Sequence, residues 1–189
     1  MDIKNTENNY GLVSILIHWL MALLIIGLFI LGVYMVDLDY YSKWYIVAPL
    51  WHKAVGMLVF FLLFFRVGWV LINTRPLPLS NYKKWERVLA KITHVSFYVL
   101  LFVVSVSGYF ITTAKGASID IFGWFEIAAI TKIDSEKARI VGELHELFAY
   151  LIAFLFVLHV GATIKHHFID KDTTLLRILK PNKPKESSK

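Results

Sequence analysis

The histidines are the residues of this sequence whose type and spacing could do chemistry. Seven occur in 189 residues that contain no cysteine, and five lie in or beside long apolar runs: His18, His52, His94, His145 and His159. Ionisable side chains in such runs are costly, so each needs a partner or a ligand. The lack of cysteine excludes disulfides, iron–sulfur clusters and haem attached through thioethers, which leaves imidazole and carboxylate as metal ligands.

The spacing of these histidines predicts two facing pairs. His145 and His159 are 14 residues apart, which on a helix puts them within about 40° of one face and about 21 Å apart along the axis. In an antiparallel bundle, His18 then lies level with His159, and His52 with His145. Facing neutral imidazoles in a bundle core are a suitable axial pair for haem iron, whereas zinc needs more ligands at each level. His94 competes with His18 as the partner of His159.

Three further residues fit the same plan. Arg66 follows His52 by 14 residues, so it shares that helix face and could pair with a propionate at the level of His159. Gly32 follows His18 by the same interval; it either lets a porphyrin edge approach the backbone or packs two helices together. Lys53 either binds a propionate at the level of His52 or extends to the membrane interface.

The elements that must position these residues are membrane spans. The chain is 57% apolar and only 18% charged, with a mean hydropathy of +0.59, which argues against a soluble enzyme. Four runs are long enough to cross a bilayer as helices, at about 12–36, 51–72, 92–114 and 143–165, with a polar tail at about 170–189. The first run has no basic region before it and no cleavage site after it, so we expect it to remain as a span rather than be removed as a signal peptide.

The positive charges orient these spans. Fourteen of the twenty lysines and arginines fall on the side that carries both termini, so both termini are predicted to be cytoplasmic. The net charge of +6 therefore indicates orientation and not a nucleic-acid partner. The sequence predicts an all-α fold, a single domain over 1–189 that is an antiparallel four-helix membrane bundle enclosing two haems. The loop at 115–142 could form a short amphipathic helix over the outer haem or a docking surface for a partner.

Several short motifs, taken in order, resemble one family. They are SILIHW at 14–19, HKAVG at 52–56, RV at 66–67, TH at 93–94, SGY at 107–109, LHE at 144–146 and KHHFIDKDTTLLR at 165–177. Together they resemble the bacterial cytochrome b561 family of membrane dihaem cytochromes, which are related to the b-type subunits of hydrogenases and formate dehydrogenases. The resemblance covers nearly the whole chain. It implies two haem b groups, held by His18 and His159 on the cytoplasmic side and by His52 and His145 on the periplasmic side.

The resemblance also implies a function in the bacterial inner membrane and its respiratory chain. A stand-alone member of this kind resembles superoxide oxidase, which passes electrons from superoxide through the haems to ubiquinone or another quinone. The alternative is a dihaem membrane anchor that exchanges electrons with a bound redox protein, and a haem-free structural bundle is a third reading. The expected partners are lipid, a quinone and a small anionic or protein electron donor. The candidate residues outside the haem ligands are, for the quinone, His94, His166, Lys83, Lys84 and Arg87, and for attraction of an anionic donor, Lys53, Lys132, Lys137 and Arg139.

Overall fold

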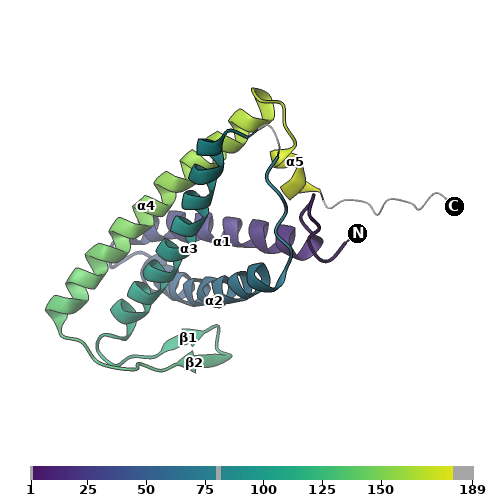
Figure 1. The fold of residues 1–189 in the computed structure, drawn as a ribbon. Helices are drawn as coiled ribbons and strands as arrows, with labels where there is room; N and C mark the ends of the chain where they lie inside the picture. The colour runs from purple at the N-terminus through teal and green to yellow at the C-terminus, as the bar shows by residue number, and fades with distance from the viewer. Residues whose placement is uncertain (1, 80–81, 181–189) are drawn as a thin grey trace.

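The fold consists of four long helices, one short helix and a small hairpin. The computed structural model describes residues 2–79 and 82–180. In chain order, the elements are α1 (Leu12–Val36), α2 (Trp44–Ile72), α3 (Lys84–Thr113), β1 (Ile119–Ile121), β2 (Phe125–Ile127), α4 (Ser135–Phe168) and α5 (Thr174–Leu179) (Figure 1). The four long helices are each long and apolar enough to span a membrane. The prediction of four membrane helices is therefore confirmed.

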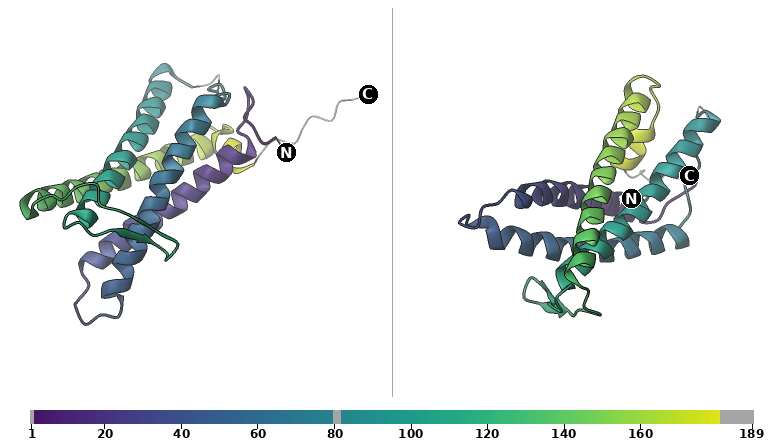
Figure 2. Two further views of the ribbon diagram at one scale, coloured as in Figure 1. Left: turned by 90° about the horizontal axis from the view of Figure 1, so that it is seen from below. Right: turned by 90° about the vertical axis from the view of Figure 1, so that its left-hand side faces the viewer.

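The long helices pack in chain order around a small core. Helix α1 packs against α2, α2 against α3, and α3 against α4, and the α1–α2 pair crosses the α3–α4 pair (Figure 2). The core of this contact is apolar and is formed by Ile17, Met21, Val59, Leu63, Leu101 and Ile152.

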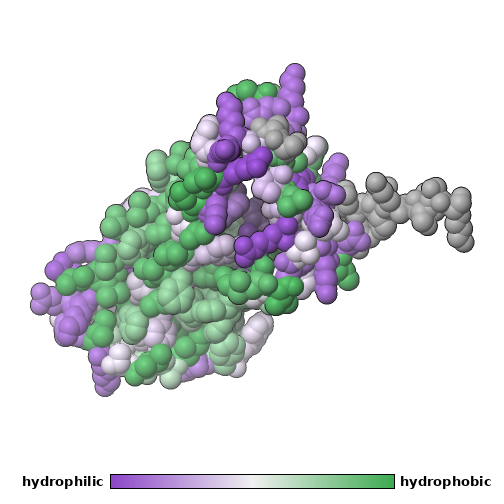
Figure 3. All heavy atoms as spheres, in the orientation of Figure 1, coloured by the Kyte–Doolittle hydropathy of each residue, from purple (hydrophilic) through white to green (hydrophobic). Residues whose placement is uncertain are grey.

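The outer surface of the bundle is also apolar. Leu23 is 66% exposed, Phe64 53% and Phe154 60%. Apolar residues cover the middle of the molecule, and hydrophilic residues gather toward its ends (Figure 3). Such a surface is suited to contact with lipid tails, because helices satisfy their own backbone hydrogen bonds there.

Three of the helices begin before the apolar runs that the sequence identified. Helix α2 begins at Trp44, α3 at Lys84 and α4 at Ser135, whereas the predicted spans began at 51, 92 and 143. Polar caps account for two of these earlier starts. The Asp134 carboxylate accepts a hydrogen bond from the backbone nitrogen of Lys137 at 2.9 Å, and Glu86 accepts one from that of Lys83 at 2.9 Å. Side chains at these positions satisfy the free N–H groups of a helix end.

The loop at 115–142 contains a β-hairpin, not the amphipathic helix that the sequence allowed. Strands β1 and β2 pair antiparallel, and the turn between them includes Phe122 and Gly123, both with positive φ. The hairpin packs on α2 through a cluster that includes Ala54 and Met57. These two residues lie about 200° and 140° around the helix from His52. The hairpin therefore covers the side of α2 that faces away from the histidine.

The N-terminal segment, the α2–α3 connector and α5 meet at one end of the molecule. The Asn5 amide donates to the Thr74 carbonyl at 2.9 Å, and the Trp19 indole donates to the Ile178 carbonyl at 2.9 Å. The Arg177 guanidinium also donates to a carbonyl of the connector. An even number of spans places both ends of a chain on the same side of a membrane. The tail predicted at about 170–189 contains α5 in its described part, and residues 181–189 lie outside the described residues.

Candidate functional site

The structure brings together one of the two predicted histidine pairs on α2 and α4. The ring centres of His52 and His145 are 6.2 Å apart. An imidazole nitrogen binds a metal at about 2.0–2.1 Å, and the ring centre lies roughly 1.2 Å behind that nitrogen. Two axial imidazoles on one metal ion therefore have ring centres about 6.4 Å apart. The observed distance matches this value.

The second predicted pair, on α1 and α4, has the same geometry. The ring centres of His18 and His159 are 6.4 Å apart. His94 lies in the same group, with its ring centre 5.6 Å from that of His159. The His18 distance fits a shared metal ion better than the shorter His94 distance does. The structure thus places three imidazoles at this level and two at the other.

Helix α3 holds the His145 ring from the side. The His145 Nδ1 lies 2.9 Å from the Val104 carbonyl oxygen and 3.1 Å from the Ser107 hydroxyl oxygen. A carbonyl only accepts, so Nδ1 carries the proton and donates it. Nε2 is then the nitrogen with a free lone pair, which is the arrangement that metal-binding histidines need. The sequence singled out Ser107 only as part of a motif, because this contact depends on the register between two helices.

Two glycines lie against the rings of the α2–α4 pair. A Cβ atom added to Gly108 would lie 3.0 Å from Cε1 of His145, and one added to Gly32 would lie 3.2 Å from Cε1 of His52. Gly32 was predicted to allow close approach at this level, and the group that approaches it is the imidazole itself. The role of Gly108 was missed in the sequence.

Arg66 reaches the level of His18, as its spacing predicted. Its Nη2 lies 3.2 Å from Nδ1 of His18, and its Nε donates to the Tyr98 hydroxyl at 3.3 Å. Among the residues that the structure describes, no carboxylate forms an ion pair with this guanidinium. A partly buried cation of this kind is stabilised by a nearby anion. A haem propionate would supply that anion, so the residue fits the predicted cofactor.

Helix α4 contributes imidazoles to the bundle centre but few fully buried apolar side chains. Ile152 is its one buried residue among those described, and α1 and α4 are not among the closely packed helix pairs. The two helices approach each other through side chains such as His18 and His159. Five imidazoles at two levels, a guanidinium without a carboxylate partner among the described residues and two close-approach glycines are compatible with two haems in the bundle.

A polar cluster joins the ends of α3 and α4 beyond these histidines. The Lys165 ammonium lies 2.8 Å from the Glu86 carboxylate and 2.8 Å from that of Asp170. Glu86, His166 and Asp170 are close enough for a metal ion, but the lysine already supplies a cation to both carboxylates. The sequence did not identify Glu86, and it singled out Asp170 only as part of a motif.

The candidate quinone residues lie at two levels. His94 is beside His159, whereas His166 is at the end of α4, stacked on Tyr82 with ring centres 4.6 Å apart. His166 Nδ1 lies 2.8 Å from the Asp170 carboxylate and 3.0 Å from that of Asp172. The remaining candidates, Lys83, Lys84 and Arg87, are exposed at the start of α3. The structure thus does not gather all of these residues into one site.

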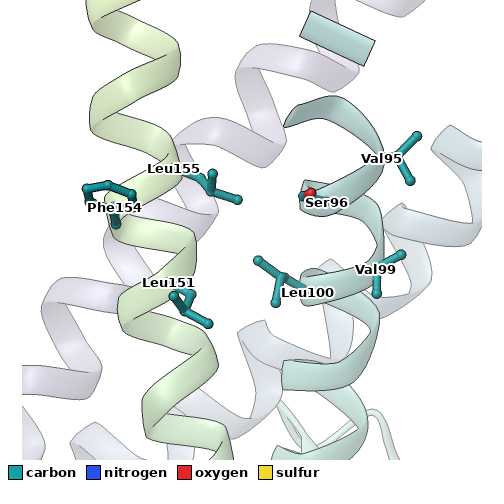
Figure 4. A pocket seen from close by; sticks show the side chains of 7 residues that line it. All are labelled: Val95, Ser96, Val99, Leu100, Leu151, Phe154 and Leu155. Carbon is teal, nitrogen blue, oxygen red and sulfur yellow. The ribbon is translucent and has the colours of Figure 1, made fainter. Parts of the chain in front are cut away.

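A groove between α3 and α4 begins at Val95, next to His94 in the chain, and at Leu155, about one turn from His159 toward the membrane centre. Its volume is about 410 Å³, and its lining is apolar except for one hydroxyl (Figure 4). Leu100, Leu151, Leu155 and Ser96 point toward the space between the helices (Figure 4). An apolar groove in a span is open to the lipid phase and to molecules dissolved in it.

The cations predicted to attract an anionic donor are partly neutralised. Lys137 pairs with Asp134 at 2.8 Å, and Arg139 pairs with Glu143. Both pairs are exposed, so the field of these two cations is weakened by their partners and by salt. Lys53, next to His52 in the chain, and Lys132 are the remaining members of that set.

Comparison with known proteins finds one matching family and several relatives. The family described as "Prokaryotic cytochrome b561" matches residues 9–181. "Cytochrome b561 homolog 2" of Escherichia coli (strain K12) is 42% identical over 179 residues, which cover 95% of each chain. "Cytochrome b561 homolog 1" of the same organism is 27% identical over 138 residues, 73% of this chain and 78% of that one. "Probable superoxide oxidase CybB" of Yersinia pestis is 29% identical over 185 residues, 92% of this chain and 97% of that one.

Proposed function

This chain belongs to the prokaryotic cytochrome b561 family of haem b membrane electron-transfer proteins, and we propose that it carries electrons from a periplasmic donor to a membrane quinone. The observation that carries the proposal is the separation of the two histidine pairs, 6.2 Å and 6.4 Å between ring centres. Both values are within about 0.2 Å of the spacing of two axial imidazoles on one iron, about 6.4 Å. A single coincidence of this kind would be weak, but two at different depths of one bundle support a two-haem path.

The residues divide into two sets under this proposal. His18 and His159 would hold the cytoplasmic haem, with Arg66 binding one of its propionates. His52 and His145 would hold the periplasmic haem, and Lys53 would bind a propionate there. When bound, haem supplies the reversible one-electron chemistry of iron. The protein would orient the imidazoles and surround them with apolar side chains, and the Val104 and Ser107 oxygens would keep the binding nitrogen of His145 unprotonated.

Superoxide is the proposed electron donor. The similarity to the Yersinia pestis protein supports it, although that relative shares only 29% of its residues. Each superoxide would give up one electron and leave as dioxygen. A quinone takes up two electrons and two protons to become a quinol, so two superoxide ions would be consumed for each quinol formed. Lys53 and Lys132 would supply the positive field on the donor side.

The proposed acceptor is a quinone on the side of His18 and His159. His94 lies at that level and has nitrogen atoms suited to a hydrogen bond with a quinone carbonyl. The groove between α3 and α4 supports this assignment, because it offers an apolar lining for an isoprenoid tail that arrives from the lipid phase. His166, Lys83, Lys84 and Arg87 would contribute nearer the surface, where protons are taken up from water.

The proposed location is the bacterial inner membrane, with both termini in the cytoplasm and one domain over the whole chain. The four spans support a multi-pass protein, and the excess of lysine and arginine on one side supports the orientation. The contacts between Trp19 and α5 are consistent with both ends of the chain lying on that side.

The first experiment is to measure haem per polypeptide in detergent-purified protein, with His18→Ala, His52→Ala and His94→Ala variants. We expect two haems in the wild type, one in each of the first two variants, and two in His94→Ala. Loss of a haem in His94→Ala, with both haems retained in His18→Ala, would reassign the cytoplasmic ligand. Absence of haem from protein made in haem-sufficient cells would refute the proposal.

The donor and acceptor need a second experiment. Stopped-flow mixing of the oxidised protein with superoxide should reduce the haems, at a rate that falls with ionic strength. Quinone should then reoxidise them, more slowly in His94→Ala. Haems that superoxide does not reduce, in a protein that co-purifies with a redox partner from gently solubilised membranes, would instead indicate an anchor subunit.

A further inference from the structure

The first turns of α3 precede its uncharged run at 92–114 and carry a row of cations. Lys84, Arg87 and Lys91 are all exposed. At 100° per residue, these three side chains lie within about 60° of one another around the helix. They form one strip along the outside of α3, which we call the basic stripe.

A second row of exposed side chains runs beside the basic stripe. Trp85, Val88, Leu89 and Ile92 are each more than half exposed. Their spacing of three and four residues places them on one helix face about 100° wide, which we call the apolar stripe. Contiguous exposed apolar side chains mark a contact surface, and tryptophan is typical of the boundary between lipid and water.

A buried carboxylate fixes the direction in which both stripes face. Glu86 is buried and lies 2.8 Å from the Lys165 ammonium of α4. It lies about 200° around the helix from Lys84, on the side of α3 that faces its neighbour. The basic stripe and the apolar stripe therefore face away from the bundle, toward the surrounding lipid.

The basic stripe also lies at the depth of lipid headgroups. It extends about 10 Å along the axis of α3 and ends at Lys91, directly before the uncharged run. The polar layer on each side of a bilayer is roughly 5–8 Å thick. The three cations therefore reach through the layer that contains the phosphates.

The cations of the basic stripe have no anionic partner in the described part of the chain. None of them forms an ion pair with a carboxylate of residues 2–79 or 82–180, whereas Lys165 close by is paired with both Glu86 and Asp170. Three outward-facing cations beside an apolar surface are complementary to a phosphate that carries acyl chains. Arginine can bind phosphate oxygens through two parallel hydrogen bonds, and lysine binds them as a point charge.

We propose that the basic stripe binds the headgroup of an anionic phospholipid, whose acyl chains lie along the apolar stripe. In the proposed orientation this lipid belongs to the cytoplasmic leaflet, where surface cations are attracted to anionic lipids. The inference goes beyond the proposed function, because it concerns the lipid around α3 and requires neither haem nor quinone.

Native mass spectrometry of the full-length protein in neutral detergent tests the proposal. Phosphatidylglycerol is added together with an equal amount of phosphatidylcholine that has the same acyl chains. The wild type should retain phosphatidylglycerol in preference. Each cation lost should weaken that binding about fivefold, so Lys84→Gln/Arg87→Gln/Lys91→Gln should weaken it on the order of 100-fold and leave phosphatidylcholine binding unchanged.

The matched control is Lys4→Gln/Lys171→Gln/Lys180→Gln, which removes three exposed cations that lie outside α3. It should retain the preference for phosphatidylglycerol. Equal losses in the two triple variants would overturn the proposal, because they would show a general attraction between net charges. Equal binding of the two lipids by the wild type would also overturn it.

A single substitution keeps the test available if the triple variant does not fold. Lys91→Gln should weaken phosphatidylglycerol binding about fivefold, and Lys91→Arg, which keeps the charge, should restore it. Unchanged binding in Lys91→Gln would then refute the proposal. No quinone or electron donor is present in this experiment, so its failure would leave the proposed electron-transfer function standing.

Discussion

Replacing Gly108 with alanine should remove the periplasmic haem. The new Cβ would lie 3.0 Å from Cε1 and 3.3 Å from Nδ1 of His145. Carbon atoms pack favourably at about 3.5–4.0 Å, so the ring must move by roughly 0.5 Å or more. Metal–ligand distances in protein sites vary by only about 0.2 Å. A ring displaced by more than twice this tolerance, and pushed from its Val104 and Ser107 contacts, should not bind iron well.

Other glycines of the bundle give a graded comparison. A Cβ at Gly32 would lie 3.2 Å from Cε1 of His52 and 3.7 Å from its Nδ1, so the ring needs a smaller movement. We expect Gly32→Ala to weaken haem binding by about 10- to 100-fold without abolishing it. A Cβ at Gly27 would meet nothing within 4 Å, and Gly27 is exposed on the side of α1 opposite His18. Gly27→Ala should keep both haems and stabilise its helix by roughly 0.5–1 kcal/mol.

The assay is haem per polypeptide, from the pyridine haemochrome spectrum, on variants purified side by side. Gly108→Ala should fall from two haems to one, with the spectrum of the remaining haem matching that of His52→Ala protein. Two haems with an unchanged spectrum in Gly108→Ala would refute the reasoning. Equal losses in Gly108→Ala and Gly27→Ala would show a general effect on folding rather than an effect on His145.

Three further variants test the contacts that hold the ends of the bundle. Gly11→Ala would overlap the backbone carbonyl of Lys4, so thermal unfolding in detergent should show a loss of about 1–3 kcal/mol, the usual cost of overpacking. Lys165→Gln leaves Glu86 without its cation, so the melting temperature should fall, and the fall should be smaller when Glu86→Gln is also present. Tyr109→Phe removes hydrogen bonds of 2.8 Å to two backbone groups of the segment after the hairpin; hydrogen exchange there should accelerate, with a local loss of about 1–3 kcal/mol.

The spans and the histidine pairs could be predicted because both follow from local rules. Uncharged runs of about 20 residues identify a membrane helix. The 14-residue interval between His145 and His159 fixes their relative direction on any straight helix. Antiparallel threading then determines which histidine lies opposite each one. The ring separations in the structure agree with these expectations, which used no information about side-chain packing.

The groups that hold the ligands could not be predicted, because they depend on how neighbouring helices are registered. A rotation of α3 by one residue would turn Ser107 away from His145, and nothing in the local sequence fixes that rotation. The same holds for the Lys165 contact with Glu86, which joins residues 79 positions apart. The starts of α3 and α4 were also predicted too late in the sequence. Glu86 and Asp134 cap these helices in polar regions where hydropathy gives no signal.

The β-hairpin escaped prediction for a different reason. Its strands are three residues long, too short for an alternating pattern to stand out from the surrounding loop. Its turn places Phe122 at a φ of 54°, a conformation that bulky residues rarely adopt. The strands form because Ile119 and Ile121 are buried against α2, which is a tertiary contact.

The place of this hairpin makes it a convenient site for engineering. Its tip, at Gly123 and Trp124, is exposed, and no heavy atom lies within 4 Å of a Cβ added at Gly123. Exposed loop tips of this kind tolerate insertions well. Because the hairpin rests on the far side of α2 from His52, an epitope tag, a fluorophore or a surface tether grafted at its tip would report on the protein or immobilise it without disturbing the redox core.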